Sequence, residues 1–384
     1  MRSLRGHLPL WRNPSGRGIV LATLSLLALG VVMVHSAKVS LAVTKAWYLR
    51  EEVRHTVYAV LAAAVLLLAW RLDYRHLVRG DRFPVLPAMG LTLAMLCGLL
   101  VFVPGVGKAV GGDARWIRLG ASTHAITFQP SELIKLGLII FLAAWLSRTE
   151  KVGSFFRTFL PAAGLIGLCL MVVVTQDFGA AVIIGTAASV TLLLGGVPWY
   201  YLASLLPPAA AGFYVFVMKT PHRWARIEAM LNPWAPGPGT YQPQQSMLAI
   251  FTGGWFGRGL GAGIQKMGFL PEDHTDFIFS AFCEEWGFVG AVLLLGLVVM
   301  WTVQVYRAAA TSSDRFGRLL AGSLGFLIAM QALMHVAVDT GLAPPTDANL
   351  PFVSYGGTAL VLSAAATALI VSVTAHRQPE LADV

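Results

Sequence analysis

Long apolar segments recur along this chain and decide what it can fold into. Ten of them, separated by more polar connections, lie at roughly 18–36, 54–70, 84–103, 132–147, 158–174, 179–196, 200–218, 277–305, 319–338 and 357–374. A helix of about 20 apolar residues crosses the hydrocarbon core of a bilayer. Charged residues make up only 12% of the chain, whereas about a quarter is usual for a soluble domain. The sequence therefore predicts an all-α fold, a polytopic membrane bundle of about ten transmembrane helices.

The connections between these predicted spans differ in charge. Lysine and arginine concentrate before the first span and after the second, fourth and eighth spans. With ten spans these connections fall on one side, which the positive-inside rule makes the cytoplasmic side. We therefore expect a multi-pass protein of the cytoplasmic membrane with both termini cytoplasmic: an N-terminal segment 1–17, a membrane domain 18–374 and a tail 375–384. The net charge of +9 then reflects topology and anionic lipid head groups, not nucleic acid.

The longest connection, 219–276, joins the seventh and eighth predicted spans on the extracytoplasmic side. It combines "NPWAPGPGTYQPQQ", which is rich in proline and glycine, with the apolar, glycine-dense "SMLAIFTGGWFGRGLGAG". Such a segment is too apolar to be disordered and too rich in glycine to be a plain helix. We expect a structured loop with short or re-entrant helices packed on the outer face of the bundle. We also expect the glycines at 253–263 to make it mobile.

Five of the chain's 19 acidic residues lie within 268–290, "GFLPEDHTDFIFSAFCEEWGFVG". The eighth span should begin near Asp276, so this carboxylate could simply cap the helix. A cap does not explain why Glu272, Asp273 and His274 come just before it. Clustered carboxylates raise the pKa of one member and favour a proton acceptor. They are also ligands for Mg²⁺ or Mn²⁺, so a divalent cation is the one cofactor to consider.

A second charged group lies at the start of a predicted span, in "FQPSELIKLG" at 128–137. Pro130 suits the first turn of a helix, Ser131 suits its N-cap, and Glu132 and Lys135 share one helix face. A lysine inside a bilayer costs about 2.5–3.5 kcal/mol, so such a residue is a candidate for function. The alternative is a purely structural ion pair between Glu132 and Lys135.

Three arginines fall on the predicted outer side: Arg115 in "GDARWIRLG", and Arg223 and Arg226 in "PHRWARIEAM". Guanidinium groups bind phosphate through paired hydrogen bonds. Several arginines beside carboxylates at a lipid boundary suit a substrate with a pyrophosphate head and a lipid tail. Each arginine on its own could instead extend to lipid head groups. The three cysteines lie in apolar runs, where packing is their expected role.

Three motifs connect this chain with a known family: "QPSE..K", "GG.FG.GLG...QK...LPE.HTDFIF...EE.G..G" and "LPFVSYGG". By these motifs the chain is identified as a member of the SEDS family (shape, elongation, division and sporulation), which includes FtsW, RodA and SpoVE. The resemblance covers the whole membrane region, and Gln265-Lys266 resembles FtsW more than RodA. The chain departs from the family pattern at 175–179, at Asn232 and at Asp347, where a turn glycine is usual.

The resemblance implies a peptidoglycan glycosyltransferase that polymerises lipid II on the outer face of the cytoplasmic membrane and releases undecaprenyl pyrophosphate, for cell division or for elongation. It implies a class B penicillin-binding protein, a transpeptidase, as partner, together with other divisome or elongasome proteins. The family's catalytic aspartate matches Asp276, and its cavity lysine matches Lys135. The expected substrate contacts are Lys135, Glu132, Arg115, Arg223, Arg226, Gln245, Lys266, Glu272, His274 and Ser354.

The expected reaction inverts the configuration of the anomeric carbon. Asp276 would take the proton from the acceptor 4-hydroxyl of lipid II, while Lys135 and the arginines would stabilise the departing pyrophosphate. Glu284 and Glu285, about 12 Å further along the helix, are expected to be structural. A flippase that transports lipid II would use the same cations but needs no base. A scaffold that only recruits the transpeptidase would leave Lys135 unexplained.

Overall fold

The computed structural model describes residues 13–38, 47, 50–79, 83–103, 105–110, 113–119, 126–237 and 239–376. Residues 1–12 and 377–384, which make up most of the two predicted terminal segments, lie outside the described residues. Nine helical segments of the described chain are long and apolar enough to cross a membrane. They are α1 (Pro14–Lys38), α2 (Glu51–Ala69), α4 (Pro130–Arg148), η4 (Phe155–Phe159) with α5 (Leu160–Val174), α6 (Phe178–Gly195), the segment Trp199–Met218, α11 (Ile278–Ala310), α12 (Arg315–Asp339) and α13 (Gly357–Ala375). This confirms the predicted polytopic helical bundle.

Two of the predicted spans have less regular structure than the sequence suggested. α3 (Val85–Leu100), which follows the short helix η3 (Tyr74–Val78), has 16 residues. At 1.5 Å per residue it is about 24 Å long, shorter than the roughly 30 Å of a hydrocarbon core. The seventh predicted span consists of α7 (Trp199–Ala203), α8 (Leu206–Phe213) and η5 (Tyr214–Met218). Pro207 and Pro208 stand at the start of α8, where a continuous helix would need the N–H groups that they lack.

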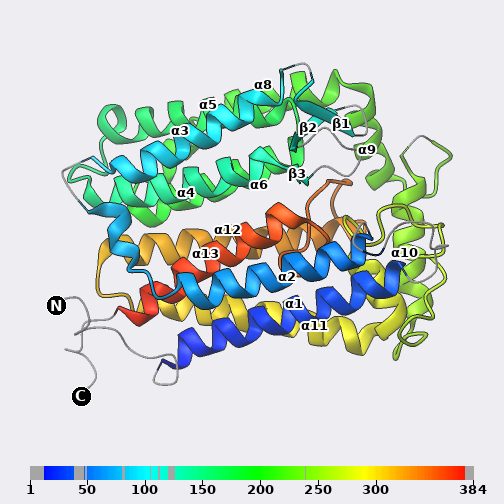
Figure 1. Cartoon of the computed structure of the whole chain (residues 1–384). Coiled ribbons are helices and arrows are strands. Elements are labelled where there is room, and N and C mark those ends of the chain that lie inside the picture. The colour runs from blue at the N-terminus through cyan, green and yellow to red at the C-terminus, as the bar shows by residue number, and fades with distance from the viewer. Residues whose placement is uncertain are drawn as a thin grey trace.

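Three helices form the centre of the bundle. α4, α12 and α13 are largely buried, and each contacts the other two. α1 packs against α11, α6 packs against α4 and α12, and α2 lies along α13 (Figure 1). The segment Trp199–Met218 lies at the periphery, and few of its residues are buried. Polar side chains on the central helices are therefore held inside the protein, where a charge in a membrane is tolerated best.

The two ends of the bundle differ. α1 begins and α13 ends at one end, whereas α9 (Pro221–Leu231), α10 (Tyr241–Gly253) and a small sheet lie at the other (Figure 1). The antiparallel strands of this sheet are β1 (Gly107–Val110), β2 (Asp113–Leu119) and β3 (Ile126–Phe128), with β2 in the middle. These strands were not predicted from the sequence. The β-branched and aromatic pair Trp116 and Ile117 favours one, and the strand holds Arg115 at this end of the molecule.

The longest connection is structured, as its composition predicted, and α10 packs directly against α11. Its glycines allow backbone to approach backbone. A Cβ on Gly253 would lie 2.0 Å from the carbonyl oxygen of Cys283, and one on Gly257 would lie 2.1 Å from that of Glu285. At the same contact α11 is kinked at Gly287, whose φ of 68° favours glycine. The glycines therefore serve close packing, and the mobility of this segment stays a prediction.

Candidate active site

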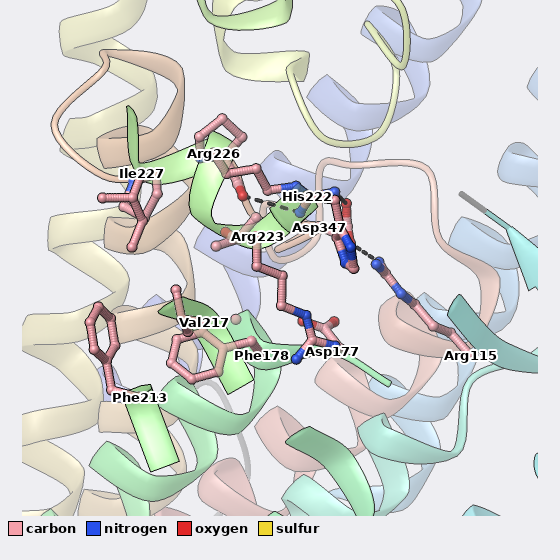
Figure 2. A pocket seen from close by; sticks show the side chains of 14 residues that line it. Arg115, Asp177, Phe178, Phe213, Val217, His222, Arg223, Arg226, Ile227 and Asp347 are labelled. Carbon is pink, nitrogen blue, oxygen red and sulfur yellow. Dashed lines mark hydrogen bonds and ion pairs between the residues drawn. The ribbon is translucent and has the colours of Figure 1, made fainter. Parts of the chain in front are cut away.

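A pocket with a volume of about 100 Å³ lies at the end of the bundle that carries α9 and the sheet. It is enclosed by β2, the start of α6, α9 and the loop between α12 and α13 (Figure 2). Phe178, Phe213 and Val217 form part of its apolar wall. Its charged and titratable residues are Arg115, Asp177, His222, Arg223, Arg226 and Asp347. The three arginines that the sequence analysis grouped therefore meet in one pocket.

Asp347 is the residue that joins two of these arginines. Its Oδ2 forms an ion pair with Nη1 of Arg115, and its Oδ1 lies 3.8 Å from Nη2 of Arg226. Arg226 also donates a hydrogen bond to the carbonyl oxygen of Pro345 at 3.2 Å. Two guanidinium groups facing one carboxylate form the arrangement that would bind a phosphate. The sequence analysis noted Asp347 only as a departure from a family pattern, because nothing local shows that its partners are two distant arginines.

Arg223 is bound differently. Its guanidinium donates to the carbonyl oxygens of Val174 at 3.0 Å and Thr175 at 3.1 Å, at the end of α5. Carbonyl groups at a helix C-terminus carry partial negative charge and favour a cation. Arg223 thus fastens α9 to α5 while its side chain lines the pocket. All three guanidinium groups have protein acceptors around the pocket, which weakens the alternative of contact with lipid head groups alone.

A smaller cavity of about 20 Å³ adjoins the pocket and shares Asp177 and Asp347 with it. Here Nζ of Lys135 donates to Oε1 of Glu132 at 2.8 Å and to Oε1 of Gln331 at 2.6 Å. All three side chains are buried. The ion pair proposed from the sequence therefore exists, and it lies beside the pocket. Gln331, on α12, was missed, although a glutamine inside an apolar span was the signal that could have found it.

One prediction about a helix start was wrong. α4 begins at Pro130, and its N-cap residue is Gln129, not Ser131. Because Pro130 occupies the first helical position of α4, the N-cap residue lies two residues before the predicted one. α11 begins at Ile278, one residue after the predicted start at 277, and its N-cap residue is Phe277. The alternative in which Asp276 only caps this helix is therefore excluded. Asp276 instead belongs to a turn in which the N–H groups of Asp276 and Phe277 both donate to the carbonyl oxygen of Glu272, at 3.1 and 3.2 Å.

Asp276 does not line the pocket, but its carboxyl group is close enough to interact with the charges around it. Its surroundings raise its pKa to about 7. Burial is the main cause, followed by the negative charges of Glu272 and Asp177, while Arg115 and Arg226 act in the opposite direction. Part of the residue's surface stays exposed, whereas its carboxyl group is buried. A carboxyl group that titrates near pH 7 can accept a proton at neutral pH and release it again.

His274 and Ser354 hold the segment that carries Asp276. Nδ1 of His274 lies 3.0 Å from Asp273 Oδ1, and its Nε2 lies 3.4 Å from Glu51 Oε2 on α2. Burial disfavours the imidazolium, but the hydrogen bonds to Asp273 and Glu51 outweigh it and raise the pKa of His274. Ser354 donates to the carbonyl oxygen of Thr275 at 2.7 Å. Neither side chain lines the pocket, so the structure supports a positioning role rather than substrate contact.

Of the remaining predicted contacts, Lys266 belongs to a separate buried cluster. Its Nζ donates to Glu285 Oε1 at 2.6 Å and to Ser36 Oγ at 2.9 Å. Glu284 accepts the backbone N–H groups of Ile264 at 2.9 Å and of Gln265. Both glutamates therefore anchor the glycine-rich loop to α11, as expected for structural residues.

Gln245 and Glu272 complete the predicted set. Gln245 lies on α10, outside both cavities. Glu272 is exposed, and its φ of 58° places it in the left-handed region where side chains are uncommon. Its Oε2 accepts the hydroxyl of Thr275 at 2.8 Å, which helps to shape the turn before Asp276. Glu272 therefore acts on Asp276 through charge and backbone geometry.

The described residues contain no group of three or more His, Cys, Asp or Glu side chains arranged to hold a metal ion. The carboxylates of the pocket are engaged: Asp177 caps α6 through the N–H of Ala180 at 2.9 Å, and Asp347 is paired with arginine. This donor set does not fit a cation held by protein ligands alone. A divalent cation that takes most of its oxygen ligands from phosphate and water, as Mg²⁺ does, stays an expectation.

Similar proteins are known over nearly the whole chain. The family model FtsW/RodA/SpoVE, described as cell cycle protein, matches residues 17–379. A probable peptidoglycan glycosyltransferase FtsW of Geobacter metallireducens is 37% identical over 362 residues, covering 93% of this chain and 93% of that protein. A protein of the same name from Thioalkalivibrio sulfidiphilus is 36% identical over 374 residues, covering 94% and 89%.

Two solved structures share the fold. One, from work on structural coordination of polymerization and crosslinking by a peptidoglycan synthase complex, has a TM-score of 0.71 at 26% identity and covers 93% of this chain and 97% of that one. The crystal structure of the rod shape determining protein RodA of Thermus thermophilus has a TM-score of 0.63 at 26% identity, with coverage of 93% and 95%.

Proposed function

The chain belongs to the cell cycle protein family of FtsW, RodA and SpoVE and is a peptidoglycan glycosyltransferase; from this premise we propose how its pocket polymerises lipid II. The observation that carries the proposal is the place of Asp276. A carboxyl group with a pKa of about 7 lies within the field of two arginines that line a pocket. A base and an anion-binding group side by side are what glycosyl transfer from a pyrophosphate requires.

In the proposed reaction Asp276 is the general base. It takes the proton from the 4-hydroxyl of the acceptor lipid II as that oxygen attacks the anomeric carbon of the growing chain. The bond between this carbon and the pyrophosphate oxygen breaks, the configuration inverts, and undecaprenyl pyrophosphate leaves with the bonding electron pair. The acceptor proton stays on Asp276 until solvent removes it. General base catalysis of this kind contributes about 10²–10⁴-fold to the rate.

The departing pyrophosphate carries the charge that the pocket has to stabilise. Arg115 and Arg226 already face one carboxylate, Asp347, and their forked N–H groups fit phosphate oxygens equally well. Lys135 lies in the adjoining cavity with Glu132 and Gln331 and adds positive charge from inside the bundle. Arg223 holds α9 in place through α5. We assign no step to a metal ion.

The pocket must widen for this reaction. Pockets for small ligands have volumes of about 300–1,000 Å³, whereas the pocket measures about 100 Å³ and its neighbour about 20 Å³. A disaccharide-pentapeptide on a lipid carrier therefore needs α9 or the loop after α12 to move outward. Since donor and acceptor are both lipid-linked, their access route is sideways from the bilayer.

The proposed setting is the cytoplasmic membrane, with the pocket on the outer face and both termini in the cytoplasm. The basic connections support this orientation through the positive-inside rule. The proposed partner is a class B penicillin-binding protein within a divisome or elongasome. Likeness to a chain from a peptidoglycan synthase complex supports a partner, and the FtsW relatives favour division.

Purified protein in detergent, supplied with lipid II and where needed its transpeptidase, tests the function directly. The wild-type chain should form glycan strands there, whereas a flippase has no membrane to act across and would form none. Asp276→Asn should fold normally and lose at least about 100-fold in rate, because the amide keeps the shape but not the basicity. Glycan synthesis by Asp276→Asn at the wild-type rate would remove Asp276 from the mechanism.

A further inference from the structure

The start of α11 takes its cap from another helix. The N-cap residue of α11, Phe277, makes no side-chain capping hydrogen bond. Asp339, at the end of α12, supplies one instead: its Oδ2 accepts the backbone N–H of Ser280 at 2.9 Å and the Ser280 hydroxyl at 3.0 Å. Ser280 and Asp339 are fully buried. An unpaired N–H at a buried helix start is costly, so this carboxylate determines where α11 begins.

Asp339 is poorly placed for its own helix. It is the last residue of α12, where the helix dipole is negative and a carboxylate is disfavoured. At the first turn of α11 the free backbone N–H groups need acceptors, and a carboxyl oxygen of Asp339 supplies one. The position of Asp339 is therefore explained by what it does for α11.

A third helix joins this contact. The hydroxyl of Ser246, on α10, donates to the backbone carbonyl oxygen of Asp339 at 2.7 Å and lies 2.5 Å from the hydroxyl oxygen of Ser280. Ser246 is also fully buried. We call Ser246, Ser280 and Asp339 the three-helix contact. It connects α10, α11 and α12 through buried hydrogen bonds, and polar contacts of this kind favour one arrangement of the helices.

Asp276 lies between this contact and a tight turn. On one side its N–H and that of Phe277 donate to Glu272. On the other side, the N–H of Ala281 donates to the carbonyl oxygen of Phe277 at 3.2 Å, which is the first hydrogen bond of α11. Only Phe277 separates Asp276 from the helix, so a shift of the helix start moves its carboxyl group relative to the pocket. A misplacement of about 1 Å can cost about 100-fold in rate.

We propose that Asp339 is a positioning residue for glycosyl transfer: through the three-helix contact it fixes the start of α11 and thereby the place of Asp276 beside the arginines. Asp339 does not line either cavity and touches no reacting atom in this proposal. The inference rests on the proposed function, since it concerns the same reaction.

The test measures kcat and KM for lipid II polymerisation in detergent, together with Tm. Asp339→Ala should lower kcat by about tenfold or more and leave KM nearly unchanged, because the base moves while the pocket is intact. Asp339→Asn should restore most of the rate, since its amide oxygen can accept the Ser280 N–H. Asp339→Ala should also shift the pH at which the rate rises, because Asp276 moves relative to the charges around it. In Asp339→Asn this pH should again be the wild-type value.

Asp314→Ala is the matched control. Asp314 caps the opposite end of α12 by accepting the N–H of Gly317 at 3.0 Å, far from the pocket. This variant should lower Tm but leave kcat within about twofold. The double variant Ser246→Ala with Ser280→Ala removes only two hydroxyl groups, so it keeps the proposal testable if Asp339→Ala does not fold. It should lower kcat about threefold at an unchanged KM.

Wild-type kcat in both Asp339→Ala and the double variant, beside a lowered Tm, would overturn the proposal and leave Asp339 with a structural role. An Asp339→Asn variant as slow as Asp339→Ala would also overturn it, because the negative charge would then matter more than the cap. In either case an inactive Asp276→Asn leaves the proposed function standing. An inactive wild-type protein would remove both.

Discussion

At the scale of single residues, the charge on Asp276 is set by side chains from separate parts of the chain. Glu272 lies in the same turn, Asp177 caps α6, Arg115 is on β2 and Arg226 is on α9. Burial raises the pKa of Asp276 most, the two carboxylates raise it further, and the two arginines lower it. The fraction of molecules in which Asp276 is ionised therefore depends on the fold, and it changes most steeply around pH 7.

This leads to a prediction about pH. The pKa of Asp276 is about 7, above its ordinary value of 3.8, and the base form is the carboxylate. The polymerisation rate should therefore rise as the pH increases through about 7 and fall below it. Glu272→Gln removes a negative charge that raises this pKa, so the rising limb should move to lower pH. Initial polymerisation rates between pH 5 and 9 measure this shift, with Glu150→Gln, at an exposed position, as the control. If the pH dependence of Glu272→Gln equals that of wild type, the assignment of Asp276 as the titrating base is contradicted.

Lys135 allows its structural and functional roles to be separated. Lys135→Ala leaves Glu132 buried without its cation, which should lower the free energy of unfolding by about 3–5 kcal/mol. Lys135→Met with Glu132→Gln removes both charges and should recover most of that stability. If Lys135 stabilises the leaving group, the double variant should still polymerise about 10²-fold more slowly than wild type. A stable double variant with normal activity would mean that the pair is only structural.

Asp347 should compete with the substrate's phosphates for Arg115 and Arg226. Asp347→Asn keeps the size of the side chain and removes the internal anion, so inorganic pyrophosphate should inhibit at a concentration about tenfold lower, or ~1.4 kcal/mol tighter. Asp73→Asn, at the start of η3 and away from the pocket, is the control. Equal inhibition of Asp347→Asn and wild type would show that the arginines bind pyrophosphate without displacing Asp347.

At the scale of elements, the contact between α10 with its following loop and α11 is made backbone to backbone. The N–H groups of Arg258 and Gly259 donate to the carbonyl oxygens of Glu284 and Glu285, at 2.9 and 3.1 Å. In return, the N–H of Phe288 donates to the carbonyl oxygen of Gly254 at 2.9 Å. Such a contact leaves no room for a Cβ atom between the two backbone segments. Together with the side chains of Glu284 and Glu285, it binds the glycine-rich loop firmly to the helix that starts beside Asp276.

The contact predicts a large difference between two glycine substitutions. Gly253→Ala would place a Cβ against the Cys283 carbonyl oxygen, so it should destabilise the fold by roughly 1–3 kcal/mol. Gly212→Ala, in α8, meets no atom within 4 Å and should be neutral or slightly stabilising through helix propensity. Thermal unfolding of the two variants in detergent compares them. Similar Tm values would contradict the close contact.

At the scale of the whole molecule, the segment that carries Asp276 is held from several directions. α2 reaches it through Glu51 and His274, α12 through Asp339, and the loop before α13 through Ser354. The pocket near this segment is too small for the proposed substrate, so the proposed reaction requires another part of the pocket's boundary to move. α9 is the element whose side chains close the pocket while most of its surface is not buried.

Hydrogen exchange tests where the molecule opens. If a bound transpeptidase activates the enzyme by shifting the population of an open form, it should change protection in the longest connection, 219–276. The anchored glycines predict that the change lies in α9 and in 267–276 more than in 253–266. Exchange should be measured with and without the cognate transpeptidase, alongside the polymerase rate. A clear rise in rate without any change across 219–276 would mean that activation runs through another element.

The sequence by itself determined the membrane bundle, because apolar runs of bilayer length and a few basic connections are local signals. It also singled out Asp276, Lys135 and the arginines, since charge in an apolar chain is conspicuous wherever it falls. It could not assign partners. Asp347 meets Arg115 across 232 residues of chain, and Lys266 meets Ser36 across 230. Only the tertiary structure decided that His274 and Ser354 hold the segment that carries Asp276 while Arg223 and Arg226 line the pocket. Hydrogen bonds between buried groups depend on which helices pack together, and no local pattern encodes that.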